Sequence, residues 1–357
     1  MRRVIINGAN GYVASHFISE LLVNGYDVVA LVRERSNATS EQRMHEALEE
    51  IDARFDSANL KVYSYSLLDK NYALTRQQLK EIFNGEIDFF HFAACLKFKS
   101  RDRDVIFETN VNGVENSVQV FKNNASADSR FFLAGTAYSC GKNTDLFKEK
   151  FYENTDISAF RNYYEQSKRY AENVIKKYIE EEDLNAHILR LSQVVGDNKT
   201  GVITTNYGIF DFIKKLQTFS DKFPNEKIRV KIDPDSTQNL IPVDKVVSYL
   251  MKSVQKDELP VIMNFVGRQP MKNRQILSSV CDLLPVEIVP EKELNKKDMS
   301  RHEKMIASGM SFGQAYAGIK LKFDTSNLEK YFSPNGNEIN RDSLHKMIKY
   351  FVEHQRE

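Results

Sequence analysis

The feature that most constrains the fold of this chain is a regular alternation of short β-branched runs with longer amphipathic stretches over the first two hundred residues. Six runs have the composition of strands: Val4 to Asn7, Val28 to Val32, Leu60 to Tyr65, Phe89 to Ala93, Arg130 to Ala134 and His187 to Leu191. The stretches between them repeat apolar residues at spacings of three and four, as helices do: Tyr12 to Val23, Gln42 to Phe55, Val105 to Phe121 and Tyr163 to Glu182. This alternation predicts an α/β fold with a doubly wound parallel sheet, covered by helices on both faces.

The chain changes character after residue 200, where the alternation weakens and helical stretches dominate. We expect a smaller, mainly helical C-terminal substrate domain there, with a turn at Ser333-Pro334-Asn335-Gly336. Two segments within it, Ile241 to Val254 and Val261 to Val266, have the patterns of a helix and a strand that return to the main sheet. The predicted domains are residues 1–200, with 240–267 returning to them, and a cap made of residues 201–239 and 268–357.

Composition and charge narrow the range of partners. The chain has 357 residues, of which 41% are apolar and 28% charged, as is typical of a folded globular protein. Its 50 basic and 49 acidic side chains leave a net charge of +1, so no global field favours nucleic acid. No apolar run reaches the ~20 residues needed to span a bilayer, and the first run is too short for a signal peptide. Cys95, Cys140 and Cys281 lack the spacing of metal ligands or of a disulfide framework, so we expect a cytoplasmic protein without a metal site.

A glycine turn joins the first predicted strand to the first predicted helix. It reads Gly8-Ala9-Asn10-Gly11-Tyr12-Val13-Ala14. Small residues at such a turn let the backbone approach a pyrophosphate, and the following helix supplies unpaired N–H groups and a partial positive charge. At the start of a βα series, this turn predicts a Rossmann domain over residues 1–200. We expect the cofactor phosphates to be bound at Gly8, Asn10, Gly11, Tyr12 and Val13.

The end of the second predicted strand bears on the choice of cofactor. An NAD-binding domain should place an acidic side chain here, but the chain reads Leu31-Val32-Arg33-Glu34-Arg35. The guanidinium of Arg33 suits the additional phosphate of NADP through charge-assisted hydrogen bonds. In the alternative interpretation, Arg33 and Arg35 are solvated and Glu34 contacts the ribose. The sequence favours NADP(H).

A tyrosine and a lysine one helical turn apart give a second chemical signal. This spacing occurs three times, at Tyr138 and Lys142, at Tyr164 and Lys168, and at Tyr316 and Lys320. Gly141 and Gly318 adjoin or interrupt the first and third pairs, whereas Tyr164 begins an uninterrupted amphipathic stretch. Thr136 follows the fifth predicted strand, at the carboxyl edge where open α/β sheets bind ligands. We therefore expect Thr136, Tyr164 and Lys168 to meet at this edge.

These three side chains fit the reduction of a carbonyl group. Hydride addition places negative charge on oxygen, which a hydroxyl donor and a proton source must meet within ~3 Å. Thr136 can donate a hydrogen bond and Tyr164 can deliver the proton. Because the pKa of free tyrosine is ~10, a neighbouring ammonium such as that of Lys168 is needed to favour its anion near neutrality.

Several motifs occur in an order typical of one superfamily. They are the glycine turn, His91-Phe92-Ala93-Ala94, Asn110-Val111-Asn112-Gly113, Thr136, and Tyr164 with Lys168. Together they resemble the extended branch of the short-chain dehydrogenase/reductase superfamily. Two longer segments, Asn162 to Glu172 and Leu189 to Gly201, are similar to NADPH-dependent thioester reductases and fatty acyl-CoA reductases. The resemblance spans nearly the whole chain, and it implies that the cofactor site includes Ala93, Ala94, Asn110, Tyr164, Lys168, Leu191 and Val194.

Three positions depart from the family pattern. Leu191 replaces the proline that usually follows the arginine, Gly135 replaces a common serine, and Ser66 stands where an aspartate often approaches the adenine. The first of these changes affects the backbone beside the expected nicotinamide. The substrate pocket can therefore differ from that of the family.

The resemblance implies that the chain reduces an acyl thioester, carried by coenzyme A or by an acyl or peptidyl carrier protein, to an aldehyde. Two alternatives keep the fold and the catalytic residues. One is a reductase or dehydrogenase of a free ketone, aldehyde or alcohol, as in the dihydroflavonol-reductase-like and hydroxysteroid branches, and the other is a sugar-nucleotide epimerase or dehydratase. A third alternative is a catalytically silent NADP sensor. The resemblance is compatible with a monomer or a homodimer.

Overall fold

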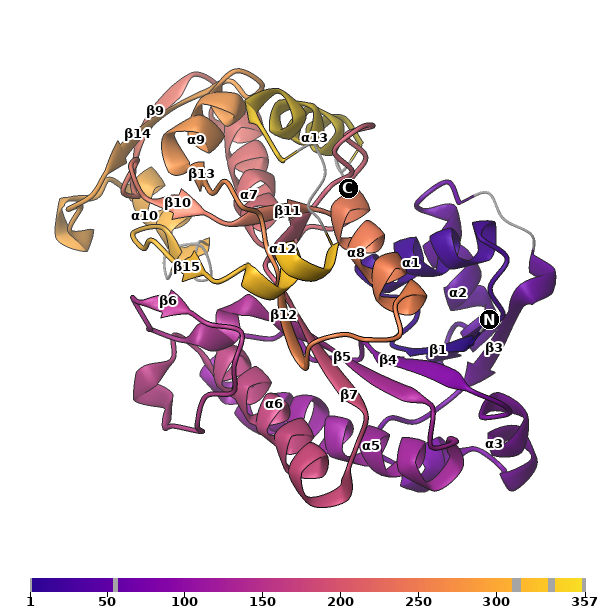
Figure 1. The fold of residues 1–357 in the computed structure, drawn as a ribbon. Coiled ribbons are helices and arrows are strands. Elements are labelled where there is room, and N and C mark those ends of the chain that lie inside the picture. The colour runs from indigo at the N-terminus through magenta and orange to yellow at the C-terminus, as the bar shows by residue number, and fades with distance from the viewer. Residues whose placement is uncertain (1, 54–56, 310–315, 333–337, 355–357) are drawn as a thin grey trace.

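The centre of the protein is a seven-stranded parallel sheet, seen edge-on between helices in Figure 1. The computed structural model describes residues 2–53, 57–309, 316–332 and 338–354. In spatial order the strands are β12 (Ile262–Phe265), β7 (Ala186–Leu191), β5 (Arg130–Thr136), β4 (Ile87–His91), β1 (Arg3–Asn7), β2 (Val28–Val32) and β3 (Leu60–Ser64). The chain runs outward from β1 to β3 and then returns to continue through β4, β5 and β7 on the other side. This order confirms the predicted doubly wound α/β fold.

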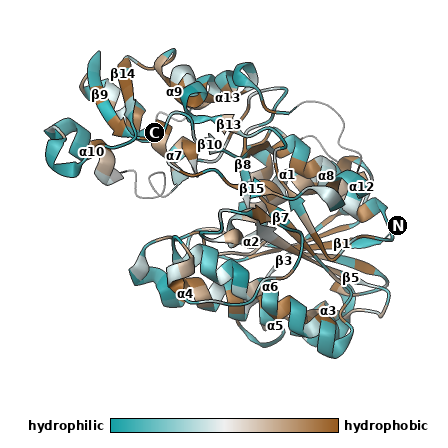
Figure 2. Cartoon of the chain, turned by 60° about the vertical axis from the view of Figure 1, so that its left-hand side comes forward, coloured by the Kyte–Doolittle hydropathy of each residue, from teal (hydrophilic) through white to brown (hydrophobic). Residues whose placement is uncertain are grey.

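Helices cover both faces of the sheet because its strands are apolar on both sides. In β1, Val4 and Ile6 pack into a buried cluster on one face, whereas Ile5 packs into a second cluster on the other. The first face is covered by α1 (Tyr12–Val23), α2 (Ser40–Glu49), α8 (Val243–Gln255) and α12 (Ser326–Phe332). The second face is covered by α3 (Arg76–Ile82), α5 (Gly113–Asn124) and α6 (Tyr163–Glu182). Figure 2 shows hydrophobic colour concentrated on the strands between these two layers.

Two predicted helices differ from the observed ones. The helix expected from Gln42 to Phe55 begins earlier, because the Thr39 side chain accepts a hydrogen bond from the Gln42 N–H and caps α2. It also ends earlier than predicted, at Glu49, with Glu50 as the C-cap, so the expected extension to Phe55 was wrong. The helix expected from Val105 to Phe121 is divided into α4 (Arg103–Phe107), a π-helical turn (Glu108–Asn112) and α5.

The C-terminal part of the chain builds a second core above the sheet in Figure 1. Its helices are α7 (Ile209–Lys222), α9 (Asn273–Cys281), α10 (Arg301–Gly309) and α13 (Arg341–His354). Two parallel strands, β9 (Glu226–Lys231) and β14 (Val286–Glu291), complete it. The smaller, mainly helical domain is therefore present, with a two-stranded sheet that the sequence did not indicate. The turn expected at residues 333–336 lies outside the described residues.

Short strand pairs connect this second core to the carboxyl edge of the main sheet. β8 (Gln193–Val195), which follows β7 directly, pairs with β11 (Leu240–Pro242), and β6 (Leu146–Phe147) pairs with β15 (Lys322–Phe323). A third pair joins β10 (Thr237–Gln238) to β13 (Met271–Lys272). These contacts hold the second core over the ends of β5 and β7. None of the described helices is long and apolar enough to cross a bilayer.

Candidate active site

The glycine turn lies between β1 and α1 and is closely packed against the loop that follows β4. Gly8 has a positive φ of 63°, and a Cβ atom there would lie 2.7 Å from the backbone nitrogen of Ala93. Only glycine fits this position. Gly11 is the N-cap of α1, and no side chain among the described residues caps the helix. The first N–H groups of α1 are therefore available to an anion.

A buried asparagine that the sequence analysis missed supports this turn from below. Asn7 ends β1, and its Oδ1 accepts hydrogen bonds from the backbone N–H groups of Phe92 and Ala93 at 3.0 and 3.1 Å. Its Nδ2 lies 2.9 Å from Nδ1 of His91. Burial lowers the pKa of His91 to about 3, so this ring is neutral at physiological pH. A polar residue at the end of an otherwise apolar strand was the signal available in the sequence.

Thr136 and Tyr164 meet at the carboxyl edge of the sheet. Thr136 ends β5, and its Oγ1 donates a hydrogen bond to the backbone oxygen of Leu191 at 3.2 Å. Burial raises the pKa of the Tyr164 hydroxyl, and a hydrogen bond with the Thr136 side chain partly opposes that rise. Tyr164 is therefore protonated at neutral pH and lies beside a second hydroxyl group. The geometry suits a carbonyl oxygen that receives two hydrogen bonds and a proton.

Lys168 lies one turn after Tyr164 on α6. Its side chain is buried, and Nζ donates a hydrogen bond to the backbone oxygen of Ala134 at 3.2 Å. Burial lowers the pKa of Lys168 to about 8, while the charge of Glu172 opposes this effect. The ammonium is thus retained at pH 7 in a protein interior. The assistance that Lys168 gives to Tyr164 stays a prediction.

The start of α6 explains why this tyrosine and lysine share one face. Asn162 is the N-cap, and its Oδ1 accepts a hydrogen bond from the Glu165 N–H at 2.9 Å. The cap fixes the first turn of the helix, so Tyr164 and Lys168 point toward the same edge.

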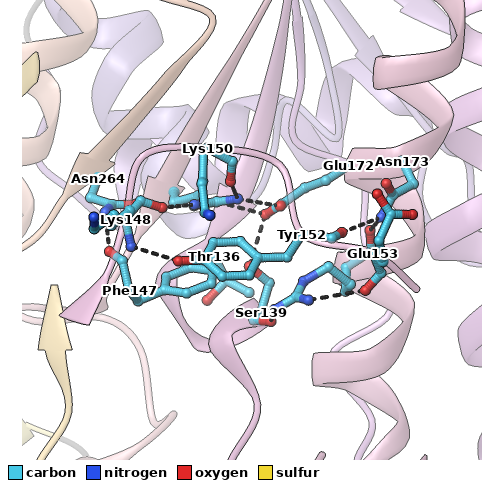
Figure 3. Close-up of polar contacts among 12 residues, drawn as sticks. Thr136, Ser139, Phe147, Lys148, Lys150, Tyr152, Glu153, Glu172, Asn173 and Asn264 are labelled. Carbon is cyan, nitrogen blue, oxygen red and sulfur yellow. Dashed lines mark hydrogen bonds and ion pairs between the residues drawn. The ribbon is translucent and has the colours of Figure 1, made fainter. Parts of the chain in front are cut away.

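Glu172, one turn beyond Lys168, is the centre of a buried polar network (Figure 3). Its carboxylate forms two hydrogen bonds with Arg190 of β7, at 3.0 and 2.6 Å, and accepts a third from the Ser139 hydroxyl at 2.8 Å. Arg190 also donates to the backbone oxygens of Lys148 and Lys150. The network joins α6, the end of β7 and the turn after Thr136. The sequence analysis gave Glu172 no role, although it follows Lys168 at the helical spacing of four.

A cavity of about 380 Å³ brings most of the predicted residues together. Its walls include Gly8, Gly11, Tyr12, Val13, Ala94, Thr136, Tyr164, Lys168, Leu191 and Val194. The hydroxyl of Ser192 also lies in its wall, buried and without a hydrogen-bond partner among the described residues. A buried unpaired hydroxyl in a cavity wall is a group that a bound molecule can satisfy. The sequence analysis missed Ser192.

Three predicted cofactor residues near the cavity do not line it. Ala93 is buried directly behind Gly8, and Asn10 is half-buried in the glycine turn. Asn110 lies in the π-helical turn, where its side chain bonds both backbone groups of Cys95 and donates to the Ser167 hydroxyl at 2.9 Å. Asn110 therefore holds the loop after β4 against α6.

Arg33 lies outside the cavity, exposed at the end of β2. It belongs to a basic cluster that also contains Arg35 and Arg43. Burial lowers the pKa of Arg43, and the charges of Arg35 and Arg33 lower it further; its side chain donates to the backbone oxygen of Arg33. Nearby, the Tyr65 hydroxyl accepts a hydrogen bond from the Gly8 N–H at 3.2 Å. Arg43 was missed in the sequence, where its position in the first turn of α2 was the available signal.

The sequence of this chain is similar to a protein family and to individual proteins of known name. A family model described as "Male sterility protein" matches residues 6–250. A protein of Aspergillus flavus, "Aldehyde reductase lnbA", is 23% identical over 263 residues, which cover 70% of this chain and 25% of that protein. "UDP-N-acetyl-alpha-D-glucosaminuronate decarboxylase" of Bacillus cytotoxicus is 27% identical over 150 residues, covering 42% of this chain and 40% of that protein. The chain thus spans well under half the length of these two relatives.

Solved structures share the fold over 99% of this chain. The terminal R domain from the myxalamid PKS-NRPS biosynthetic pathway has a TM-score of 0.81 at 16% identity, with 91% of that chain covered. A thiolation-reductase di-domain from an archaeal non-ribosomal peptide synthetase has a TM-score of 0.74 at 15% identity, with 76% covered. UDP-glucuronic acid 4-epimerase from Bacillus cereus, in complex with NAD, has a TM-score of 0.69 at 13% identity, with all of that chain covered. At these identities the similarity concerns the fold.

Proposed function

This chain belongs to the male sterility protein family, within the extended short-chain dehydrogenase/reductase superfamily, and from that premise we propose that it reduces an acyl thioester to an aldehyde with NADPH. Members of the superfamily are oxidoreductases and epimerases that bind a nicotinamide dinucleotide. The observation that carries the proposal is the meeting of Thr136 and Tyr164 in a cavity whose wall also includes the glycine turn. We propose that residues 1–200 with 240–267 form the cofactor domain, and that residues 201–239 and 268–357, apart from α12 on the main sheet, form the substrate cap.

The turn after β1 fits the pyrophosphate of the cofactor. Its backbone can approach an anion because Gly8 has no Cβ, and the uncapped N-terminus of α1 offers N–H groups there. The basic cluster Arg33, Arg35 and Arg43 supports NADP over NAD, because guanidinium groups bind a phosphate through paired hydrogen bonds. When bound, the cofactor supplies a hydride to the substrate.

The side chains of the site account for the remaining steps. Tyr164 donates a hydrogen bond to the thioester oxygen, and Thr136 donates a second when its hydroxyl turns from the Leu191 oxygen that it bonds in this structure. The thioester oxygen becomes an oxyanion as the carbonyl carbon accepts hydride. Tyr164 transfers its proton to that oxyanion and gives a hemithioacetal. The carbon–sulfur bond then breaks, the thiol leaves with a proton, and an aldehyde remains. Lys168 stabilises the Tyr164 anion until a proton returns from solvent.

The thioester is supported by the names of the similar structures rather than by a contact in this chain. The R domain comes from a PKS-NRPS pathway, and the di-domain joins a reductase to a thiolation domain. A reductase beside a thiolation domain acts on an acyl group held on a carrier. We propose the same class of substrate here, with coenzyme A as the soluble carrier and an acyl or peptidyl carrier protein as the protein carrier.

The proposal is tested with purified protein, NADPH and a series of acyl-CoA thioesters. We expect NADPH oxidation, free thiol and aldehyde in equal amounts. Tyr164→Phe should lower kcat by about 10²- to 10⁴-fold while NADPH still binds, because it removes the proton donor and keeps the ring. Absence of turnover with every thioester would exclude the proposal, and unchanged cellular function of Tyr164→Phe would favour a silent sensor.

A second candidate is the reduction of a free aldehyde or ketone, which the name of the Aspergillus flavus relative favours. It uses the same residues without loss of a thiol. Turnover of free aldehydes together with inert thioesters would identify it. An epimerase or dehydratase, favoured by the names of the UDP-sugar proteins, would instead retain tightly bound NAD through purification.

A further inference from the structure

A second, smaller cavity opens beside the active-site cavity. Its volume is about 60 Å³, and Tyr138, Gln193 and Gly208 line both cavities. The remaining wall is chiefly apolar and comes from the C-terminal core: Ile209, Phe212, Ile232, Ile276, Leu277 and Ala317. This side pocket is therefore an apolar cavity that shares part of its wall with the active-site cavity.

The wall shared by the two cavities is closely packed at Gly208. Gly208 has a positive φ of 63°, and a Cβ there would lie 2.2 Å from the side-chain nitrogen of Gln193. Any other residue at position 208 would have to displace the Gln193 side chain from this shared wall. The close approach thus holds Gln193 in the wall that the two cavities share.

Tyr316 fixes the opposite wall of the side pocket. Its hydroxyl donates to Oε1 of Glu165 at 2.5 Å and accepts a hydrogen bond from Nδ2 of Asn162 at 3.1 Å. Its ring packs edge-on against Tyr138, with 5.2 Å between the ring centroids. Both partners of the hydroxyl lie at the start of α6, next to Tyr164. The pocket wall is therefore attached to the helix that carries the proposed proton donor.

The size of the side pocket limits what can enter it. A cavity needs about 10–15 Å³ of this volume for one water-sized group, so 60 Å³ accommodates roughly four to six heavy atoms. Thr136 and Tyr138 are two residues apart, and two residues span at most about 7 Å. A few methylene groups therefore connect a carbonyl at Thr136 to the pocket entrance.

We propose that this pocket binds the apolar end of the acyl group and makes the protein selective for medium-length acyl chains, of about six to ten carbons. The inference rests on the proposed function, which supplies the position of the carbonyl. Shorter chains leave the pocket empty and lose apolar contact. Longer chains exceed its volume and cannot keep their carbonyl beside Thr136 and Tyr164.

The test is the kcat/KM profile of acyl-CoA substrates from two to sixteen carbons. We expect a maximum between six and ten carbons, with values at least tenfold lower for acetyl-CoA and palmitoyl-CoA. Phe212→Leu enlarges the pocket and should raise the ratio of kcat/KM for twelve over six carbons at least fivefold. Phe219→Leu is the matched control, because Phe219 lies on the same helix and in the same core but outside the pocket. It should leave the ratio unchanged.

Failure of the pocket proposal and failure of the proposed thioester reduction give different results in this test. A flat or rising profile to sixteen carbons, insensitive to Phe212→Leu, would overturn the inference while the proposed function stands. If no thioester is turned over, the proposed function fails, and the pocket is tested by the rise in Tm of the NADPH-bound protein with linear aliphatic alcohols. A maximum at medium length that moves in Phe212→Leu but not in Phe219→Leu would support the pocket. A rise in Tm that does not depend on the length of the alcohol would exclude an apolar binding pocket.

Discussion

At the scale of single residues, the site combines a protonated tyrosine with a lysine that carries its charge in the protein interior. Burial raises the pKa of Tyr164 and lowers that of Lys168 to about 8. The two shifts have one cause, which is the removal of both groups from water. In the proposed reaction, neutral Tyr164 is the form that donates a proton, and charged Lys168 is the form that stabilises the resulting anion.

A charged lysine in this position should cost stability. The pKa of Lys168 falls from 10.5 to about 8, so the unfolded chain binds more protons between these values and the fold gains stability as pH rises through them. Lys168→Met should therefore raise the free energy of unfolding at pH 7 by up to about 3 kcal/mol and abolish reduction. Urea unfolding at pH 7 and pH 10 checks this, and the gain should shrink at the higher pH. A variant that is less stable than the original at pH 7 would contradict it.

The basic cluster at the end of β2 allows a second prediction at this scale. Arg43→Ala should raise the KM for NADPH roughly tenfold and leave the KM for NADH nearly unchanged, because only NADPH carries the phosphate. Steady-state kinetics with both cofactors measures this. Arg76→Ala, at the start of α3, serves as the control for loss of one positive charge elsewhere. Equal effects on the two cofactors would assign the cluster to another role.

At the scale of elements, the buried pair of Glu172 and Arg190 holds α6 against β7. Both side chains are almost fully excluded from solvent, and their atoms approach to 2.6 Å. Arg190→Met should destabilise the protein by about 3–5 kcal/mol, because it leaves the Glu172 carboxylate buried without its partner. Combining it with Glu172→Leu should cost less than the sum of the single changes. Urea unfolding of the four proteins gives the coupling energy, and strict additivity would show that the pair does not act as a unit.

The elements that repeat a simple pattern were predictable from sequence, and those that depend on a distant partner were not. The six strands and α1 follow from runs of apolar residues that are local in the chain. The π-helical turn before α5 has no local signature; it places the Asn110 side chain between Cys95 and Ser167, which belong to a loop and to another helix. Glu172 was overlooked for the same reason, since its partner Arg190 lies in the following strand.

At the scale of the whole molecule, Glu149 links the C-terminal segment to the main sheet. Its carboxylate accepts hydrogen bonds from the backbone N–H groups of Asn264 in β12 and Asn327 in α12, each at 2.7 Å. Burial raises the pKa of Glu149 to about 7, although the two backbone hydrogen bonds lower this pKa in part. The packing of α12 against β12 of the main sheet therefore involves a carboxyl group that titrates near neutrality.

The raised pKa of Glu149 gives a pH dependence with a defined sign. Between its usual value of 4.5 and about 7 the folded protein binds more protons than the unfolded chain, so stability falls as pH rises through this window. Glu149→Gln should reduce the slope of the free energy of unfolding between pH 5 and pH 7. Glu153→Gln, an exposed neighbour, is the control. An identical slope in Glu149→Gln and the original protein would disprove the assignment.

In the site, too, the features with a local sequence pattern were predictable, and those that depend on distant partners were not. Gly8 in the turn after β1, Thr136 at the end of β5 and Tyr164 in α6 were each predicted from a local motif, and all three line one cavity. The side pocket could not be predicted, because Tyr138, Phe212 and Tyr316 come together only when the C-terminal core folds onto the sheet. The motifs leave the substrate open, and we expect the C-terminal core to determine it.

In the proposed reaction, a thioester carbonyl receives a hydride from NADPH and a proton from Tyr164. The most direct measurement uses octanoyl-CoA with NADPH deuterated at C4, prepared as each of the two C4 epimers, and mass spectrometry of the product. One epimer should give octanal with one deuterium on its former carbonyl carbon, in amounts equal to the free thiol, and Tyr164→Phe should give almost none. NADPH oxidation without thiol release, or octanal without deuterium from either epimer, would exclude this reaction.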